Sequence, residues 1–396
     1  MLARTTNLGE NDMSTMERLF KLMAEKKASD IYISPHAPIL IRISGQAVAI
    51  NRQVLTPEDP PKLLAEIVDA KRQRQLQDEG ELNLGLARTG IGSFRLSAFI
   101  QRGSVAMVIR YIPSDIPPLE SLNLPGVMAD LVMEKHGLIL MVGSTGSGKS
   151  TSLAAMLDHR NARMTSHILT LEEPIEFLFK NKKSIVNQRE IGIDAKSLSV
   201  GLKNALRQAP DCIMIAEIRD TETMTAALNY ALSGHLCLST LHANNSYQAL
   251  NRILGFFPLD MRPALLSDLS AGLRAVVSQR LLRATAGGLT PAVEVMLNTP
   301  LIRELIAKGD FSTIKDTMEK TMAEGSQTFE QCLARMVVEG QVGREEALAY
   351  ADSPTNLMWR LQNDFSNRPS SQPPANAMLD SDEPSFREIS LDLGAN

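Results

Sequence analysis

Residues 143 to 151 have the composition of a phosphate-binding loop. They are Gly143, Ser144, Thr145, Gly146, Ser147, Gly148, Lys149, Ser150 and Thr151. An apolar run at 138–142 precedes them and a helical stretch at 151–157 follows, the context in which GxxxxGK[ST] binds a nucleotide. Glycines let successive N–H groups face a phosphate, and the helix N-terminus adds partial positive charge. We expect Lys149 to reach the β- and γ-phosphates of ATP or GTP, and Ser150 to ligate Mg²⁺.

Two other apolar runs end in acids that could complete a hydrolytic site. Residues 212–217 end in Glu217, and residues 169–173 end in Glu172 and Glu173. Acids that follow strands of an α/β sheet lie at its ligand-binding edge. We expect Glu217 to approach Mg²⁺ or the attacking water, and Glu172 to orient or activate that water. The alternative is that both are ordinary surface or loop acids.

Two histidines, His235 and His242, bracket the apolar run 236–241. A neutral imidazole there could sense the γ-phosphate or bridge two subunits, while the alternative is a structural role. The sequence has no HxxxH pattern, and its three cysteines form neither a CxxC pair nor a disulfide framework. A zinc site is therefore not expected.

The bulk composition bounds the possibilities. At 396 residues the chain predicts two domains plus extensions, since one domain takes roughly 150 residues. The net charge of −4 argues against a dedicated nucleic-acid binder. No apolar run reaches the length of about 18 residues that would span a membrane. The first residues lack the apolar core of a signal peptide, so we expect a cytoplasmic protein.

The first 113 residues predict a small α+β domain. Ser14 and Glu17 have the spacing of a capping box, which predicts a helix start. Short alternating runs predict strands at 31–33, 39–43, 48–50, 93–99 and 105–112. A polar helix is expected at 60–79. Three prolines between 113 and 118 indicate a linker at 114–123, which would serve as a hinge.

Residues 124–352 predict a doubly wound α/β domain with a mostly parallel sheet. Continuous apolar runs typical of doubly buried strands occur at 138–142, 168–171, 212–215 and 236–241, with helical stretches between them. The part from 259 to 351 is expected to be helical. Residues 353–396 are expected to be mostly disordered, with a Pro/Ser-rich stretch at 367–376. The alternation at 386–393 predicts either a solvated tail or a strand that adds to a sheet edge.

Four segments stand in a fixed order: GSTGSGKST (143–151), LEEPIEF (171–177), IMIAEIRD (213–220) and GHLCLSTLHA (234–243). They resemble the Walker A, Asp box, Walker B and His box of the hexameric ATPases of type II secretion and type IV pili. The connecting segments SDIYIS, VNQRE, LRQAPD and VSQRLL are similar too, so the resemblance covers residues 14 to about 350. Because a tetracysteine zinc insertion is missing, the chain resembles the retraction ATPases of the PilT/PilU family. The segment 353–361 with its acidic extension is more similar to the PilU branch.

The resemblance implies a RecA-like P-loop ATPase domain preceded by a PAS-like α+β domain. It also implies a homohexameric ring that binds ATP and Mg²⁺ between subunits. In this family, arginines of the N-terminal domain contact the nucleotide of the neighbouring subunit. The matching positions here are Arg95 and Arg110, for which a structural or solvated role is the alternative. A guanidinium suits the role because it stays charged and offers forked donors.

The implied activity is retraction of type IV pili, as in twitching motility, at the inner face of the inner membrane. The implied partners are an inner-membrane platform protein and a paralogous retraction ATPase.

Two positions depart from the family pattern. Ala216 replaces the usual glycine of the Walker B segment, and Glu173 replaces the usual aspartate of the Asp box. These departures leave the turnover rate open. The alternatives are an accessory ATP-binding ring subunit, a type II secretion or pilus extension ATPase, and a nucleic-acid translocase, which the sequence does not favour because it lacks a basic stripe.

Overall fold

The computed structural model describes residues 13–43, 45–88, 90–112, 115–321 and 323–363. They form two compact units, the first ending at Ser114 and the second beginning at Asp115. In this described part of the chain, no helix combines the length and the apolar character needed to cross a membrane.

The first unit is built on an antiparallel sheet with the strand order β3-β2-β1-β6-β5-β4. Its strands are β1 (Asp30–Ile33), β2 (Leu40–Ile43), β3 (Gln46–Ala49), β4 (Glu81–Arg88), β5 (Gly92–Gln101) and β6 (Ser104–Ile112). Its helices are α1 (Thr15–Glu25), α2 (Asp59–Ala65) and α3 (Ala70–Glu79). Buried and more exposed residues alternate along β4 and most of β5, so the side chains of one sheet face pack in the core of this unit.

Helix α1 starts at the predicted capping box. The Ser14 hydroxyl accepts a hydrogen bond from Glu17 N at 3.3 Å, and the Glu17 carboxylate accepts one from Ser14 N. The helix buries Leu19, Phe20 and Met23 against every second residue of the strands. Burial of these side chains is the main force that holds α1 on the sheet.

One expectation for this unit was wrong, and one strand was not predicted. The helix expected at 60–79 is divided into α2, which ends at Ala65, and α3, whose N-cap Asp69 accepts from Arg72 N at 2.9 Å. Strand β4 was not predicted, although its residues alternate between buried and exposed. The alternation of a half-buried strand is present in its sequence, ELNLGLAR.

The second unit is built on a sheet with the strand order β13-β12-β7-β11-β10-β8-β9. The strands from β12 to β9 are parallel to one another, and β13 is antiparallel to β12. They are β7 (Gly137–Val142), β8 (His167–Glu172), β9 (Ile185–Glu190), β10 (Cys212–Glu217), β11 (Leu236–Leu241), β12 (Leu273–Arg283) and β13 (Leu289–Leu297). This arrangement confirms the predicted α/β class with a mostly parallel sheet.

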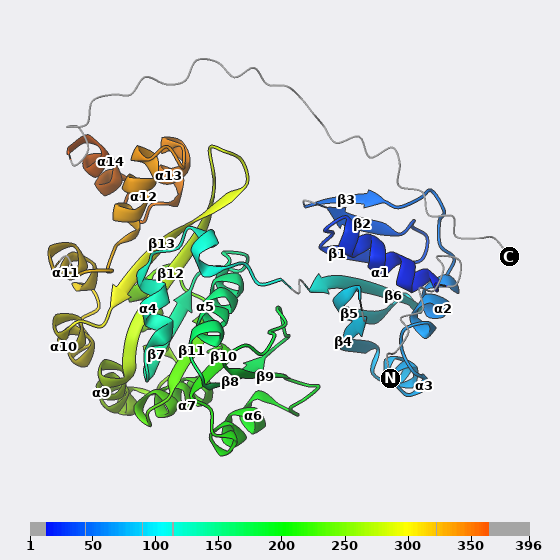
Figure 1. Cartoon of the computed structure of the whole chain (residues 1–396), viewed down its shortest axis with the longest axis horizontal. Coiled ribbons are helices and arrows are strands. Elements are labelled where there is room, and N and C mark those ends of the chain that lie inside the picture. Colours follow the sequence, from blue (N-terminus) through cyan, green and yellow to red (C-terminus); the bar gives the residue numbers. More distant parts are fainter. Residues whose placement is uncertain (1–12, 44, 89, 113–114, 322, 364–396) are drawn as a thin grey trace, which may run out of the picture. The chain divides into compact units, whose positions relative to one another are not determined.

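Helices cover both faces of this sheet (Figure 1). They are α4 (Val127–Met133), α5 (Lys149–Arg163), α6 (Leu198–Ala205), α7 (Thr221–Leu232), α8 (Ser246–Gly255), α9 (Arg262–Gly272), α10 (Pro300–Lys308) and α11 (Ile314–Thr321). Leu138, Leu140 and Val142 of β7 pack with α6–α11, whereas Ile139 and Met141 pack with α4 and α5. Because both faces of β7 are buried, all of its side chains must be apolar, and its sequence is a continuous apolar run.

The expectation that residues 259–351 are helical is confirmed for α9 to α13 but was wrong for residues 273–297. Strands β12 and β13 lie in this part and form a hairpin at the edge of the sheet. The turn contains Gly287 and Gly288, which have φ of 89° and 77°, a backbone region that glycine adopts without strain. The pair of glycines between the Val-containing stretches 276–277 and 293–295 was the available signal for a hairpin.

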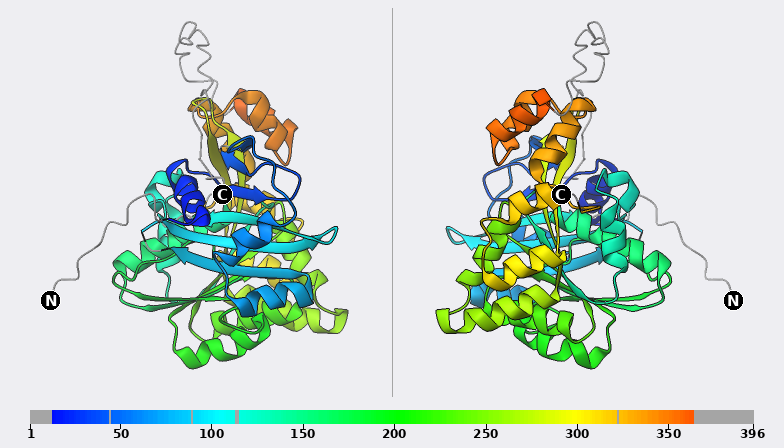
Figure 2. Two further views of the ribbon diagram at one scale, coloured as in Figure 1. Left: turned by 90° about the vertical axis from the view of Figure 1, so that its right-hand side faces the viewer. Right: turned by 90° about the vertical axis from the view of Figure 1, so that its left-hand side faces the viewer.

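Helices α12 (Phe329–Val338), α13 (Arg344–Tyr350) and α14 (Pro354–Asn363) pack on this hairpin (Figure 2). Leu357 of α14 is fully buried in the same apolar cluster as Phe329. The expectation of a disordered tail was therefore wrong for residues 354–363. The stretch 367–376 and the alternating segment 386–393 lie outside the described residues.

The segment expected to be a linker is largely attached to the second unit. Leu119–Leu122 form a short 3₁₀ helix, and Leu119 is buried in the core beside α4 and α5. Ile116 packs against the same cluster. The chain from Ile116 onward thus contributes to the core of the second unit.

Candidate active site

The loop between β7 and α5 forms a glycine-lined cradle. Gly146 and Gly148 have φ of 80° and 86°, a region that L-residues rarely adopt. A Cβ on Gly143 would lie 2.4 Å from Ser147 Oγ, and one on Gly148 would lie 2.7 Å from Gln279 Nε2. Backbone conformation and close packing therefore both require glycine here.

Lys149, the first residue of α5, lies folded against this loop. Its Nζ donates to the carbonyl oxygens of Gly143 and Ser144, each at 2.8 Å, and the residue is 8% exposed. Burial lowers the pKa of Lys149, while the carboxylates of Glu217 and Glu176 act to raise it. A partly desolvated ammonium above a cradle of N–H groups is suited to an anionic phosphate.

The other residues predicted for the cradle occupy its rim and floor. Ser144, Thr145 and Gly146 are exposed at the rim. Ser147 is buried, and its hydroxyl has no hydrogen-bond partner in the described part of the chain. Ser150 and Thr151 are half-buried in the first turn of α5. The buried Ser147 hydroxyl, which has no partner among the described residues, is free to donate a hydrogen bond to a phosphate oxygen bound in the loop.

Gln279 braces the cradle from strand β12. Its Nε2 donates to Ser147 O at 2.8 Å, and its Oε1 accepts from Ser152 Oγ at 2.8 Å. Gln279 is 3% exposed, so both hydrogen bonds are shielded from water. Sequence reasoning did not assign this residue a role, although it lies in the segment VSQRLL that carries part of the resemblance.

Glu172 ends strand β8 in a buried position, 6% exposed. Its Oε1 accepts from Thr170 Oγ1 at 2.6 Å and from Gln188 Nε2 at 3.0 Å. Burial raises the pKa of Glu172, and these two hydrogen bonds act in the opposite direction. A carboxyl with a raised pKa is a better proton acceptor than an ordinary surface glutamate.

Glu217 ends strand β10 at a register shift against β11, which changes the direction of its side chain. Its Oε2 accepts from Arg219 Nε at 2.8 Å, and its Oε1 lies 3.4 Å from His242 Nε2. Arg219 also reaches Glu173 at 3.2 Å, so it bridges the ends of β8 and β10. The hydrogen bond to Glu217 raises the pKa of Arg219, which stays charged.

The structure separates the two histidines. His242 follows β11 at the edge of the sheet where Gly143 N donates to Leu241 O, so it lies beside the cradle. His235 precedes β11, and its carbonyl oxygen accepts from Gly137 N at the start of β7. Because β11 has six residues, the histidines are about 20 Å apart along it. His235 is not brought to the cradle within this chain.

Arg95 and Arg110 are cross-strand neighbours on β5 and β6 of the first unit. Arg110 Nε donates to Asp30 Oδ1 at 2.9 Å, and Arg42 Nη1 lies 3.8 Å from Asp30 Oδ2. Since Asp30 pairs with Arg42 and Arg110 in the sheet, these four residues form one polar row. Three arginines and one aspartate leave this row with an excess of positive charge.

No cluster of three or more His, Cys, Asp or Glu side chains suited to a metal occurs within the described ranges. Mg²⁺ needs no such cage, because it prefers a few protein oxygens together with phosphate oxygens and water. The Ser150 hydroxyl beside the cradle and the Glu217 carboxylate fit that donor set. Glu217 is close enough to Lys149 to affect the pKa of its ammonium.

A parallel sheet with a phosphate loop after β7 and acids at the ends of β8 and β10 defines a RecA-like P-loop ATPase fold. The profile of the family described as "Type II/IV secretion system protein" matches residues 11–288. The chain belongs to this family, and within it to the PilT/PilU family of type IV pilus retraction ATPases.

Individual relatives cover most of the chain. The type IV pilus ATPase PilU of Pseudomonas aeruginosa is 44% identical over 86% of this chain and 90% of its own length. The type IV pilus retraction ATPase PilT of the same organism is 36% identical over 86% of this chain and 98% of its own length. A crystal structure of the pilus retraction motor PilT with bound ADP superposes with a TM-score of 0.82, at 38% identity, covering 88% of this chain and all of that one.

Proposed function

We propose that the chain is an ATP-hydrolysing motor that retracts type IV pili. The observation that carries the proposal is the grouping of Lys149, Glu217 and His242 around the glycine cradle, in a chain 44% identical to a PilU. The cradle supplies phosphate binding, and the strand-end acids supply the carboxylates that hydrolysis needs. ADP bound to the similar PilT supports a nucleotide as the ligand.

Each residue then has a definite role. The N–H groups of the loop and Lys149 bind the β- and γ-phosphates and offset their charge. The Ser150 hydroxyl and Glu217 would hold Mg²⁺, which when bound neutralises charge on the phosphate oxygens. Glu172 would accept a proton from the attacking water, and His242, beside Glu217, would contact the γ-phosphate.

The motor is proposed to be a homohexameric ring with a nucleotide site at each subunit interface. Arg95 and Arg110 would then neutralise developing negative charge on the nucleotide of a neighbouring subunit. The polar row that contains both residues supports this role, because it gathers guanidinium groups on one face of the first unit. His235, on the opposite edge of the second unit from the cradle, is assigned to subunit contacts rather than to chemistry in its own chain.

The motor would work in the cytoplasm at the inner face of the inner membrane. Its partners would be a platform protein of the pilus machinery and a paralogous retraction ATPase. The higher identity to PilU than to PilT supports a place in the PilU branch. Residues 353–361 form much of α14, so the segment that suggested this branch is a folded element.

The test is pilus retraction in cells whose chromosomal copy carries Lys149→Ala, with and without the paralogous ATPase. Loss of retraction while surface pili remain is the expected result. Loss of pili altogether would instead indicate an extension or secretion ATPase.

A second test is made in vitro. The steady-state rate of ATP hydrolysis by wild type should be well above the rate of Glu217→Gln, whereas equal rates would indicate an accessory subunit that binds ATP without turning it over.

A further inference from the structure

The loop between β11 and α8, residues 242–245, begins beside the cradle and ends in contact with the connection between α13 and α14. It begins at His242, whose Nε2 lies 3.4 Å from Glu217 Oε1. It ends at Asn245, which is 2% exposed and caps α8 by accepting from Gln248 N at 3.1 Å. The position of His242 therefore depends on what holds the far end of this short loop.

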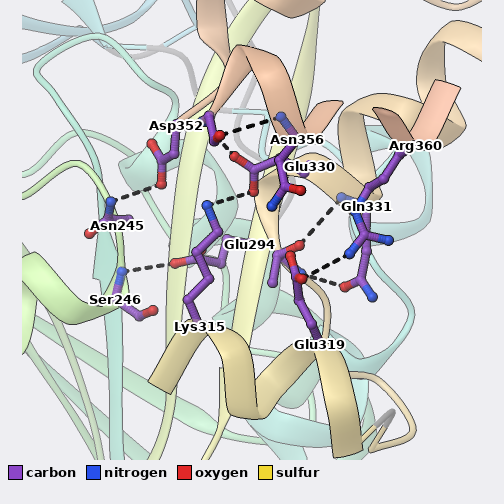
Figure 3. A network of polar contacts seen from close by, with 12 residues as sticks. Asn245, Ser246, Glu294, Lys315, Glu319, Glu330, Gln331, Asp352, Asn356 and Arg360 are labelled. Carbon is purple, nitrogen blue, oxygen red and sulfur yellow. Dashed lines mark hydrogen bonds and ion pairs between the residues drawn. The ribbon is translucent and has the colours of Figure 1, made fainter. Parts of the chain in front are cut away.

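Two acids, the buried Glu294 and the partly exposed Asp352, hold that end (Figure 3). Asp352 Oδ2 accepts from Asn245 Nδ2 at 2.8 Å, and Glu294 Oε1 accepts from Ser246 N at 2.8 Å. Glu294 is a residue of β13, whereas Asp352 lies in the short connection between α13 and α14. An element far away in sequence thus fixes the orientation of the Asn245 amide.

Arg280 joins the same connection to the preceding residue of the loop. Its Nη2 donates to Asn244 O at 3.0 Å and to Asp352 Oδ1, and its Nη1 donates to Tyr350 O. The guanidinium carbon lies 3.9 Å from the centre of the Phe329 ring. The Arg280 and Asp352 side chains are 16% and 18% exposed, so water screens their charges weakly.

The connection between α13 and α14 is itself firmly anchored. Ser353 N donates to Glu330 Oε1 at 2.8 Å, and Lys315 Nζ lies 2.9 Å from Glu330 Oε2. Glu330 is fully buried, which makes both contacts costly to break. Asp352 is therefore a fixed point against which the loop can be held.

We propose that Asp352, acting with Arg280, is a positioning residue for ATP hydrolysis. The pair clamps Asn244 and Asn245 and thereby keeps His242 beside Glu217 and the cradle. This inference rests on the proposed ATPase function and adds the C-terminal connection to the parts that the reaction needs. Asp352 and Arg280 are not among the residues proposed to hold the nucleotide or Mg²⁺, so loss of the clamp should affect turnover more than nucleotide binding.

The first measurement is steady-state ATP hydrolysis by full-length Asp352→Ala. A misplacement of about 1 Å can cost on the order of 10²-fold in rate, so we expect kcat to fall by about 10-fold or more, with KM for Mg-ATP within about two-fold of wild type. Asp352→Asn keeps an acceptor for Asn245 but loses the charge opposite Arg280, and should fall in between. If Asp352→Ala does not fold, Asp352→Asn replaces it in these measurements.

The second measurement separates positioning from general support of the fold. His242→Ala alone should lower kcat, and Asp352→Ala should lower it little further in that background, because both changes remove the same function. Amide hydrogen exchange at residues 243–248 should rise in Asp352→Ala. Purely additive losses in kcat, or an undiminished kcat in His242→Ala, would overturn the inference.

A matched control is an ion pair between the nearby helices α11 and α14. Glu319 of α11 and Arg360 of α14 form an ion pair at 3.1 Å, with side chains 21% and 15% exposed, similar to Asp352 and Arg280. Glu319→Gln should lower thermal stability comparably but leave kcat and hydrogen exchange at 243–248 unchanged. A kcat loss equal to that of Asp352→Ala would show that any damage to these helices slows turnover, against the inference.

The comparison of wild type with Lys149→Ala tests the proposed function separately. If wild type hydrolyses no more ATP than Lys149→Ala, the proposed ATPase function is wrong, and the inference about Asp352 is wrong with it.

Discussion

Strands β8 and β10 lie side by side and both end in a glutamate, but the two carboxylates have opposite surroundings. Glu172 is buried and accepts hydrogen bonds from neutral donors, the Thr170 hydroxyl and the Gln188 amide. Glu217 is more exposed and faces Arg219, His242 and Lys149. The same residue type at equivalent strand ends thus has two environments, which agree with the proposed division of proton acceptance at Glu172 and charge pairing at Glu217.

The largest effect is expected for Glu172→Gln, which removes the buried carboxylate that is proposed to accept the proton. General base catalysis contributes about 10²–10⁴-fold, so kcat should fall by that amount while Mg-ATP still binds. Single-turnover hydrolysis and equilibrium binding of a fluorescent ATP analogue measure the two properties separately. If the variant retains most of the wild-type kcat, Glu172 is not the proton acceptor. The difference between Glu172 and Glu217 would then concern only how the two side chains are packed.

Glu217→Gln is expected to lower kcat on the order of 10²-fold, since electrostatic groups at the reacting phosphates contribute at this level. Its distinguishing feature is metal dependence. Because the carboxylate is proposed to hold Mg²⁺, the Mg²⁺ concentration for half-maximal activity should rise in Glu217→Gln and stay near wild type in Glu172→Gln. Equal metal dependence in both variants would contradict the division of roles.

A smaller effect is expected for Gln188→Leu, which removes one donor to Glu172. Burial raises the pKa of Glu172 above its ordinary value of 4.5, and the Gln188 hydrogen bond acts to lower it. A base must be ionised, so activity is lost as pH falls through this pKa, and the acid limb of kcat should lie above pH 4.5 in wild type. In Gln188→Leu that limb should move to still higher pH, with kcat at neutral pH reduced by up to about 10-fold.

The neighbouring residue supplies the control for this pH measurement. Asn187 precedes Gln188 on β9, but its side chain contacts His167 on the surface rather than Glu172. Asn187→Leu should leave the acid limb of the kcat profile in place. A common shift in both variants would mean that the edge strand β9 as a whole, and not the Gln188 amide, controls Glu172.

The smallest effect is expected for Arg219→Gln. The Arg219 side chain is 57% exposed, and ion pairs of this kind contribute only about 0–1 kcal/mol to stability. Thermal unfolding should shift by no more than about 4 °C, and kcat should change by less than the change in Gln188→Leu. A large loss of kcat would show that the bridge between Glu217 and Glu173 is part of the catalytic arrangement.

Local sequence signals predicted the parts of the site that depend on short-range chemistry. The cradle needs glycines and a lysine at set spacing, and buried parallel strands need continuous apolar runs, so both were predicted from single segments. Gln279 and Gln188 were missed because their roles arise from pairing between strands that are far apart in sequence. An amide in a strand has no local pattern that shows which group it will contact.

The errors in the fold have a related cause. The hairpin of β12 and β13 was expected to be helical, because an apolar run of its length fits a buried helix or a buried strand equally well. The sheet edge beside β7 decides between the two by offering hydrogen bonds to β12. Helix α14 was assigned to the tail, because only its contact with α12 and α13 buries Leu357.

The sequence by itself determined that this chain has a nucleotide cradle at Lys149, acids after two buried strands, and membership of a retraction ATPase family. These features depend on residue types at fixed local spacing, which folding cannot alter. Only the tertiary structure decided that Glu172 is buried and Glu217 is paired, that His242 and not His235 lies at the cradle, and that Asp352 is tied to the His242 loop. Burial, strand order and long-range hydrogen bonds are properties of the packed chain, so no single segment contains them.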